Sequence, residues 1–81
     1  MFIALDYDRT FTEDPDMWTA FAAMAQARGH IVKIVTMRRP DETITDAPVE
    51  VIYTSRQAKA HVVKADVWID DSPQWIFQDS I

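Results

Sequence analysis

The sequence predicts a small α/β domain built on a doubly wound parallel sheet of about four strands. Short apolar runs alternate with segments of helical spacing, and polar residues follow each run. Strand–helix–strand alternation of this kind is typical of parallel sheets with crossover helices. With right-handed crossovers, the strands are expected in the spatial order 3-2-1-4. We expect a single domain over residues 1–81, because a chain of 81 residues has room for one core.

Four apolar runs are expected to form the strands, at residues 2–5, 31–35, 49–53 and 65–69. Short runs without alternation are typical of strands that are buried on both faces. Asp14 and Pro15 predict the start of the first helix, because one side chain can cap it and the other fits its first turn. Gly29 predicts its end, since glycine readily adopts the left-handed conformation that follows a helix.

The spacing of apolar residues predicts which side chains are buried outside the strands. The first helix should bury the face made by Met17, Trp18, Phe21, Met24 and Ala25. A second helix should start at residue 54 or 55 and run to about residue 63. Residues 37–48 should form a polar, turn-rich loop. Near the end of the chain, the residues that should pack back onto the sheet are Trp75, Ile76 and Phe77.

The composition limits the classes of function. The formal net charge is −5, with an isoelectric point near 4.7, which disfavours binding to nucleic acid through a basic face. The chain has no cysteine, so the sequence offers neither a zinc–thiolate site nor a disulfide framework. No apolar stretch has the length of a membrane span, and no signal peptide is evident. We therefore expect a cytoplasmic protein with no membrane partner.

Two acidic clusters follow apolar strands at opposite ends of the chain. Asp6 and Asp8 follow the first strand, and alternate residues of an extended chain face the same side. Asp70 and Asp71 follow the last strand. In the order 3-2-1-4 the chain reverses direction between the first and fourth strands, and ligands bind at the carboxyl edge at such a point. Grouped carboxylates repel one another unless a cation is present, and all-oxygen ligands suit Mg²⁺.

These residues are part of four ordered motifs that resemble those of the haloacid dehalogenase-like phosphatase superfamily. The first motif is an apolar strand followed by D-x-D-x-T, which this chain has over residues 6–10. The second is a strand ending in Thr36, and the third is a lone basic residue near the start of a later helix. The fourth is the pair Asp70-Asp71. The resemblance spans nearly the whole chain and implies a Rossmann-like core without a cap domain, as in a minimal member.

The resemblance implies an enzyme, a Mg²⁺-dependent phosphatase that hydrolyses phosphate monoesters through an aspartyl-phosphate intermediate. Asp6 would be the nucleophile, and Asp8 the general acid and base. Thr36 would bind a phosphoryl oxygen, and Lys59 would neutralise the transferring group. The implied metal ligands are Asp6, Asp8 through its backbone carbonyl, Asp70 and Asp71.

Some residue assignments stay open in the sequence. Arg56 and Lys64 compete with Lys59 for the third motif. Either acid of the pair at residues 70–71 could contact the metal directly. Arg9 stands where the family often has glycine, which tolerates more backbone conformations. The arginines at positions 38 and 39 are ordinarily a solvated pair, but at this edge of the sheet they are also candidates for contact with phosphate.

The absence of a cap leaves the predicted site open, which favours a large phosphorylated substrate, a covering partner or a homodimer. The site could also belong to a binding or regulatory module that keeps the fold and metal site but has little turnover. A third hypothesis is a phosphatase of nucleotides or nucleic-acid ends, which the negative charge does not support. The sequence does not identify the substrate.

Overall fold

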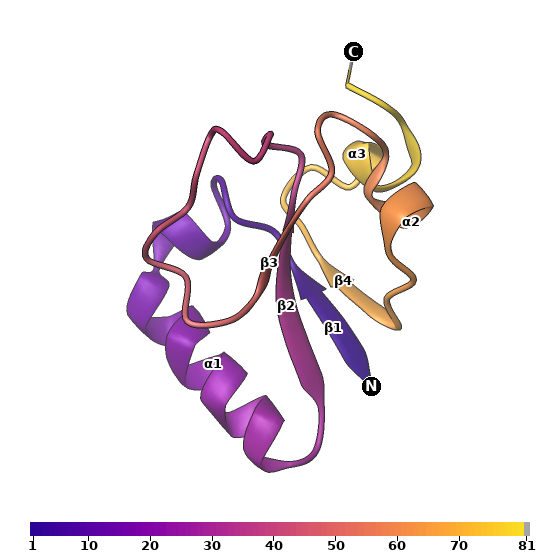
Figure 1. The fold of residues 1–81 in the computed structure, drawn as a ribbon. Coiled ribbons are helices and arrows are strands. Elements are labelled where there is room, and N and C mark those ends of the chain that lie inside the picture. The colour runs from indigo at the N-terminus through magenta and orange to yellow at the C-terminus, as the bar shows by residue number, and fades with distance from the viewer. Residues whose placement is uncertain (81) are drawn as a thin grey trace.

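The computed structural model describes residues 1–80 and has one sheet with helices on both sides (Figure 1). The strands are β1 (Phe2–Leu5), β2 (Ile31–Thr36), β3 (Val51–Tyr53) and β4 (Val67–Ile69). All neighbouring strands pair in parallel, in the order β3-β2-β1-β4. The helices are α1 (Pro15–Ala27), α2 (Lys59–Val62) and α3 (Gln74–Phe77), and Phe11–Glu13 form a 3₁₀ turn, η1. The predicted fold class and strand order are confirmed.

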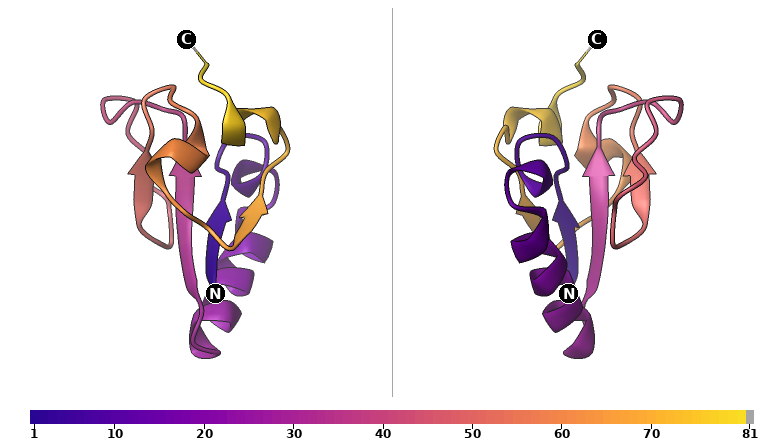
Figure 2. Two further views of the ribbon diagram at one scale, coloured as in Figure 1. Left: turned by 90° about the vertical axis from the view of Figure 1, so that its right-hand side faces the viewer. Right: turned by 90° about the vertical axis from the view of Figure 1, so that its left-hand side faces the viewer.

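The core lies between the sheet and α1, and α2 and α3 lie on the other side, near the carboxyl ends of the strands (Figure 2). Ile3 and Val32 of the central strands pack against Ala22 and Ala25 of α1. A second cluster, nearer the carboxyl ends of the strands, contains Leu5, Tyr7, Phe11, Ile34 and Ile44. Because all four strands run in one direction, the residues that follow β1 and β4 meet at one edge of the sheet.

The predicted bounds of α1 are confirmed, but its predicted buried face is only partly right. Asp14 caps the helix by accepting a hydrogen bond from the Met17 amide at 3.2 Å. Trp18 and Phe21 are half-buried, whereas the side chains of Met17 and Met24 are exposed. The buried side chains of the helix are instead those of the small residues Ala22 and Ala25, which pack in the core. A sheet of short strands covers only a narrow strip of the helix, and alanines let the two backbones approach along that strip.

The second helix is much shorter than predicted because the chain is not helical at its expected start. Ser55 and Arg56 have positive φ angles of 52° and 69°, which is left-handed backbone. Their amides donate to the carbonyls of Arg38 and Met37, at 3.2 and 2.9 Å, instead of joining a helix. These contacts tie the loop after β3 to the loop after β2. Helix α2 therefore begins only at Lys59, which places this residue at the carboxyl edge of the sheet.

The end of the chain also differs in part from the prediction. Ile76 is buried and Trp75 is half-buried, as expected, but the side chain of Phe77 is 70% exposed. Helix α3 has a single turn, so only one of its sides can face the protein. Among residues 1–80, no helix combines the length and apolar character needed to cross a membrane.

Gly29 offers a test of the α1 terminus. Its φ of 88° is unfavourable for residues with a side chain. Apart from Gly29 and its two neighbours in the chain, no atom of residues 1–80 lies within 4 Å of the position that a Cβ would take. We therefore expect Gly29→Ala to lower the free energy of unfolding by about 1 kcal/mol, through backbone strain alone. Arg28→Ala, at the neighbouring exposed position with φ −96°, should be nearly neutral in the same urea titration. Equal effects of the two changes would contradict this explanation.

Candidate functional site

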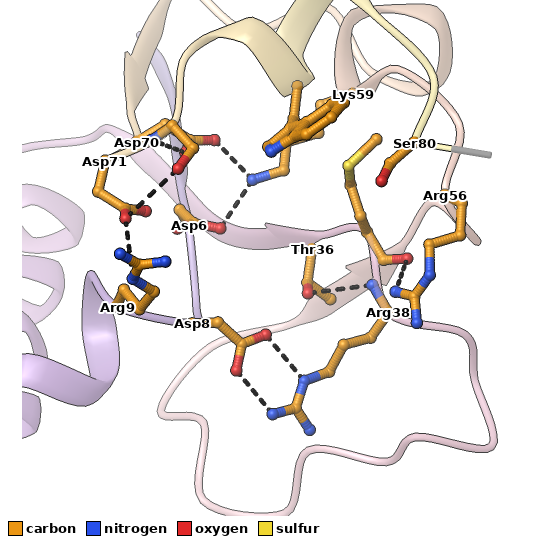
Figure 3. A pocket seen from close by; sticks show the side chains of 13 residues that line it. Asp6, Asp8, Arg9, Thr36, Arg38, Arg56, Lys59, Asp70, Asp71 and Ser80 are labelled. Atoms are coloured by element: carbon orange, nitrogen blue, oxygen red, sulfur yellow. Dashed lines mark hydrogen bonds and ion pairs between the residues drawn. The ribbon is translucent and has the colours of Figure 1, made fainter.

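A pocket of about 260 Å³ opens at the carboxyl edge of the sheet (Figure 3). Its lining includes four carboxylates, from Asp6, Asp8, Asp70 and Asp71. It also includes four cationic side chains, from Arg9, Arg38, Arg56 and Lys59. The segments that follow all four strands supply these groups, because the carboxyl ends of parallel strands lie at one edge of the sheet. The structure thus brings the two predicted acidic clusters into one site, together with Thr36 and the preferred candidate for the third motif.

Three of the carboxylates form a compact group, which we call the acidic triad: Asp6, Asp70 and Asp71. One oxygen from each lies within 4.8 Å of the others, a spacing that could hold a metal ion. Asp6 follows β1, and its amide donates to the Ile69 carbonyl of β4 at 2.9 Å. The pairing of the two strands therefore fixes the distance between the acidic clusters. The triad is a candidate site for a divalent cation.

Lys59 lies between two members of the triad and is almost completely buried. Its Nζ donates to Asp6 Oδ1 at 2.7 Å and to Asp70 Oδ2 at 2.6 Å. The side chain of Lys59 is 3% exposed, and those of Asp6 and Asp70 are 10% and 3% exposed. Buried charges of this kind are stable only when they are paired. Lys59 offsets one of the three negative charges, so two remain for another cation.

Hydrogen bonds from neighbouring residues orient the triad. Thr10 Oγ1 lies 3.1 Å from Asp6 Oδ2 and 3.3 Å from Asp71 Oδ1, so its single hydroxyl proton can serve one of them at a time. The Ser72 amide donates to Asp70 Oδ1 at 2.9 Å. Asp71 is the most accessible member, and its Oδ2 lies 3.7 Å from Arg9 Nε. Asp71 therefore has the oxygen atoms that are least committed to protein partners.

The cluster changes the acidity of its members. Burial raises the pKa of Asp6 to about 6, although the contact with Lys59 opposes this shift. A hydrogen bond with Asp6 lowers the pKa of Asp71, and the nearby Thr10 hydroxyl and Arg9 contribute in the same direction. Of these two carboxyls, Asp6 therefore holds a proton more readily, and Asp71 accepts a hydrogen bond from it. A bound cation would replace that proton.

The raised pKa of Asp6 predicts how stability depends on pH without added cation. The pKa of Asp6 in the folded state, about 6, exceeds the ordinary value of 3.8, so the folded state binds this proton more tightly than the unfolded state does. The resulting contribution to the free energy of unfolding is fully present below about pH 4 and is lost as pH rises through 6. The loss should be about 2–3 kcal/mol in urea titrations between these pH values. Asp6→Asn should remove most of this dependence. An unchanged pH profile in the variant would show that other groups cause it.

Asp8 does not join the triad, although its side chain lines the same pocket. Its carboxylate accepts two hydrogen bonds from Arg38, at 2.9 Å from Nε and 2.7 Å from Nη2 (Figure 3). This pair lowers the pKa of Asp8 and raises that of Arg38. The Asp8 side chain is therefore held away from the triad as a committed anion. Its predicted metal contact, through the backbone carbonyl, stays a prediction.

The other predicted residues lie as follows. Thr36 is buried at the end of β2, and its hydroxyl accepts a hydrogen bond from the Arg38 amide at 3.3 Å. Arg56 lines the pocket, but its guanidinium is bound to the Met37 carbonyl and to Glu42. Lys64 is exposed, beyond α2, and does not line the pocket. Lys59 is thus the candidate for the third motif that contacts the acidic residues.

Sequence reasoning missed two features of the site. The pairing of Asp8 with Arg38 joins positions thirty residues apart in sequence, and no local pattern indicates it. The contribution of Thr10 could have been found, because this residue belongs to the D-x-D-x-T motif. Arg9 stands where the haloacid dehalogenase-like family often has glycine, and its φ of 68° is a conformation that favours glycine.

A family model described as the C2 domain of protein kinase C delta, epsilon, eta and theta matches residues 8–75. This match covers most of the chain, and by it the chain belongs to that family. No curated protein and no solved structure matches the chain significantly.

The family match corrects several predictions from the sequence. C2 domains are a different family from the haloacid dehalogenase-like phosphatases, so the predicted membership in that superfamily is wrong. The same match contradicts the predictions of an enzyme, of phosphate-monoester hydrolysis and of an aspartyl-phosphate intermediate. The roles of nucleophile for Asp6 and of general acid and base for Asp8 therefore have no support from the family. The acidic triad does not depend on that assignment, because it is a feature of the structure itself.

The family match and the geometry point in different directions. The parallel order of the strands and the meeting of the two acidic clusters are both present in the structure, although the match contradicts the family that the same motifs resemble. The match starts at Asp8, so it includes neither β1 nor Asp6. The match assigns the family, and the structure defines the fold and the charges of the pocket.

Proposed function

We propose that this chain is a binding module that uses a divalent cation to hold a phosphate group without hydrolysing it. The observation that carries the proposal is the balance of charge in the pocket. Four carboxylates and four cationic side chains line it, so the lining alone is close to neutral. A divalent cation on the acidic triad would give the pocket two positive charges. A phosphate monoester, with about two negative charges near neutral pH, would match them.

The positions of the hydrogen-bond donors support the same ligand. Arginine side chains bind phosphate through paired N–H groups, and lysine binds it as a point charge. Arg38 and Lys59 both line the pocket, and Figure 3 shows Thr36 between them. A ligand at the cation would thus have donors within the same pocket. The pocket is formed at an open edge, so the phosphate can belong to a large molecule.

The family adds support for a cation and for the lack of turnover. C2 domains bind divalent cations, usually Ca²⁺, and are typically binding modules rather than enzymes. We propose Mg²⁺ as the preferred ion here, because a small group of three carboxylates leaves several positions for water. Mg²⁺ usually keeps several waters and binds one or two carboxylates plus phosphate, whereas Ca²⁺ takes six to eight oxygen ligands. The cytoplasm and a homodimer stay predictions for this module.

The test is calorimetric titration of the purified chain with Mg²⁺ and with Ca²⁺, each followed by phenyl phosphate. We expect Mg²⁺ to bind at one site, and phenyl phosphate to bind only after the cation. Asp41→Asn, an exposed position outside the pocket lining, serves as the control for the loss of one negative charge. No binding of either cation would contradict the proposal, and binding of Ca²⁺ alone would contradict the choice of ion.

The same mixtures test the absence of turnover. Inorganic phosphate released from phenyl phosphate is measured over several hours, with and without Mg²⁺. The proposal expects no release above the rate of the buffer. Mg²⁺-dependent release that stops in Asp6→Asn would contradict it, and would contradict the functional conclusion drawn from the family match.

A further inference from the structure

Arg38 is held in one orientation at the mouth of the pocket by several contacts. Its guanidinium binds both oxygens of Asp8, at 2.9 and 2.7 Å, and lies over the ring of Tyr7 at 5.1 Å from the centroid. The Tyr7 hydroxyl is itself fixed, because it donates to Asp46 Oδ1 at 2.7 Å. The Arg38 amide donates to the Thr36 hydroxyl. The paired N–H groups of Arg38 are thus preorganised to bind an anion, and the carboxylate of Asp8 occupies them in this structure.

A phosphate group can take the place of this carboxylate. Both anions accept two parallel hydrogen bonds from a guanidinium, so the donor geometry suits either one. The side chains of Arg38 and Asp8 are 31% and 49% exposed, and exposed ion pairs are weak. A phosphate that is also bound to a cation on the acidic triad would bind Arg38 in preference to the Asp8 carboxylate, because that carboxylate is bound only to the arginine.

Arg56 lacks this property, although it lines the same pocket. Its guanidinium donates to the Met37 carbonyl at 2.9 Å and to both oxygens of Glu42, at 3.0 and 3.1 Å. These contacts join the loops that follow β2 and β3, so they stabilise the rim. An anion that displaced Glu42 from Arg56 would separate two loops, whereas an anion that displaced Asp8 from Arg38 would leave the 3.4 Å contact of Arg38 with the Glu42 carbonyl in place.

We propose that Arg38 is the residue with which the pocket recognises phosphate, and that Asp8 occupies Arg38 until a phosphorylated ligand displaces it. This inference rests on the proposed function, since it requires a phosphate monoester as the ligand. Asp8 acts as a built-in competitor that lowers the affinity for weak anions. A ligand that also binds the cation overcomes the competition, so the contact adds selectivity for phosphate over carboxylate ligands.

The test is a double-mutant cycle on the affinity for inorganic phosphate, measured by calorimetry with saturating Mg²⁺. The variants are Asp8→Asn, Arg38→Gln and the combination of both. Removal of the competitor should make Asp8→Asn bind phosphate about 3- to 10-fold more tightly than the unaltered chain. Arg38→Gln should bind at least about tenfold more weakly. In the combined variant, Asp8→Asn should no longer increase the affinity for phosphate relative to Arg38→Gln alone, because there is no guanidinium for the loss of Asp8 to release.

The cycle separates this inference from a general effect of charge and from the proposed function. If Asp8→Asn raised the affinity for phosphate by the same factor in the unaltered chain and in Arg38→Gln, Asp8 would only repel anions from a distance. That result would overturn the inference. Phosphate binding that Asp8→Asn leaves unchanged or weakens would also overturn it, while the proposed function would stand. No phosphate binding by any variant that still binds Mg²⁺ would overturn both.

The source of the phosphate monoester is identified with two further ligands. Glycerol phosphate represents soluble metabolites, and vesicles of phosphatidylcholine with and without phosphatidic acid represent a lipid headgroup. Binding to either source that is tighter in Asp8→Asn and weaker in Arg38→Gln supports the inference. Equal binding to vesicles with and without phosphatidic acid, with no binding of glycerol phosphate, would overturn it.

Discussion

Replacing Lys59 with methionine is expected to destabilise the fold by about 3–5 kcal/mol when no divalent cation is present. The Lys59 ammonium lies between Asp6 and Asp70, at 2.7 and 2.6 Å, and all three side chains are nearly inaccessible to water. Methionine fills similar space but offers no charge, so two buried carboxylates would lose their partner. A domain of this size has a stability of only a few kcal/mol, so much of the variant should be unfolded.

The measurement is urea unfolding followed by tryptophan fluorescence, with and without Mg²⁺. Lys64→Met is the matched control, because it makes the same change at an exposed lysine outside the pocket and should cost less than about 1 kcal/mol. Mg²⁺ should restore part of the stability of the Lys59 variant, since a cation on the triad replaces the lost charge. Similar stabilities of the two variants would refute the structural role of Lys59.

Replacing Asp71 with asparagine is expected to reduce the affinity for Mg²⁺ about 100-fold and to change stability little. Asp71 is the most accessible member of the triad, and its side chain is 30% exposed. Its loss leaves two ligand carboxylates, both of which also contact Lys59. A unit charge about 4 Å from a cation contributes several kcal/mol in a partly buried site, and about 2.7 kcal/mol corresponds to 100-fold.

Calorimetric titration with Mg²⁺ measures this effect, and urea unfolding verifies that the variant is folded. Asp41→Asn makes the same change of charge at an exposed position outside the pocket and should leave the affinity within about twofold. The comparison separates a ligand to the ion from the general field of an acidic protein. If both variants lost the same affinity, the triad would not be the binding site.

The fold could be predicted from the sequence because its strands are short apolar runs with polar residues at their ends. The order β3-β2-β1-β4 follows from the handedness of the crossovers, and this order alone places Asp6 beside Asp70. The start of α2 could not be predicted. Ser55 and Arg56 adopt left-handed conformations that their residue types do not favour. Hydrogen bonds to the loop after β2, and one from the Ser80 amide to the Arg56 carbonyl at 2.7 Å, hold them there.

The site was predictable to the extent that it depends on strand ends. Asp6, Thr36 and Asp70 lie directly after strands or at their ends, so their positions follow from the sheet. The orientation of Asp8 depends on Arg38, which comes from a distant loop, and therefore could not be derived from spacing. The C2 match contradicts the family that was assigned from these motifs. Of the four carboxylates that the motifs predicted to meet, Asp6, Asp70 and Asp71 do so, whereas Asp8 pairs with Arg38 instead.

The presence of a divalent cation on the triad is best tested by crystallography with Mn²⁺, which has an anomalous signal that Mg²⁺ lacks. Crystals grown with MnCl₂ should show one strong anomalous peak within coordination distance of oxygens from Asp6, Asp70 and Asp71, with the Lys59 ammonium beside it. A map without a peak there, or with the carboxylates of the triad still contacting only protein groups, would contradict a cation site in this pocket.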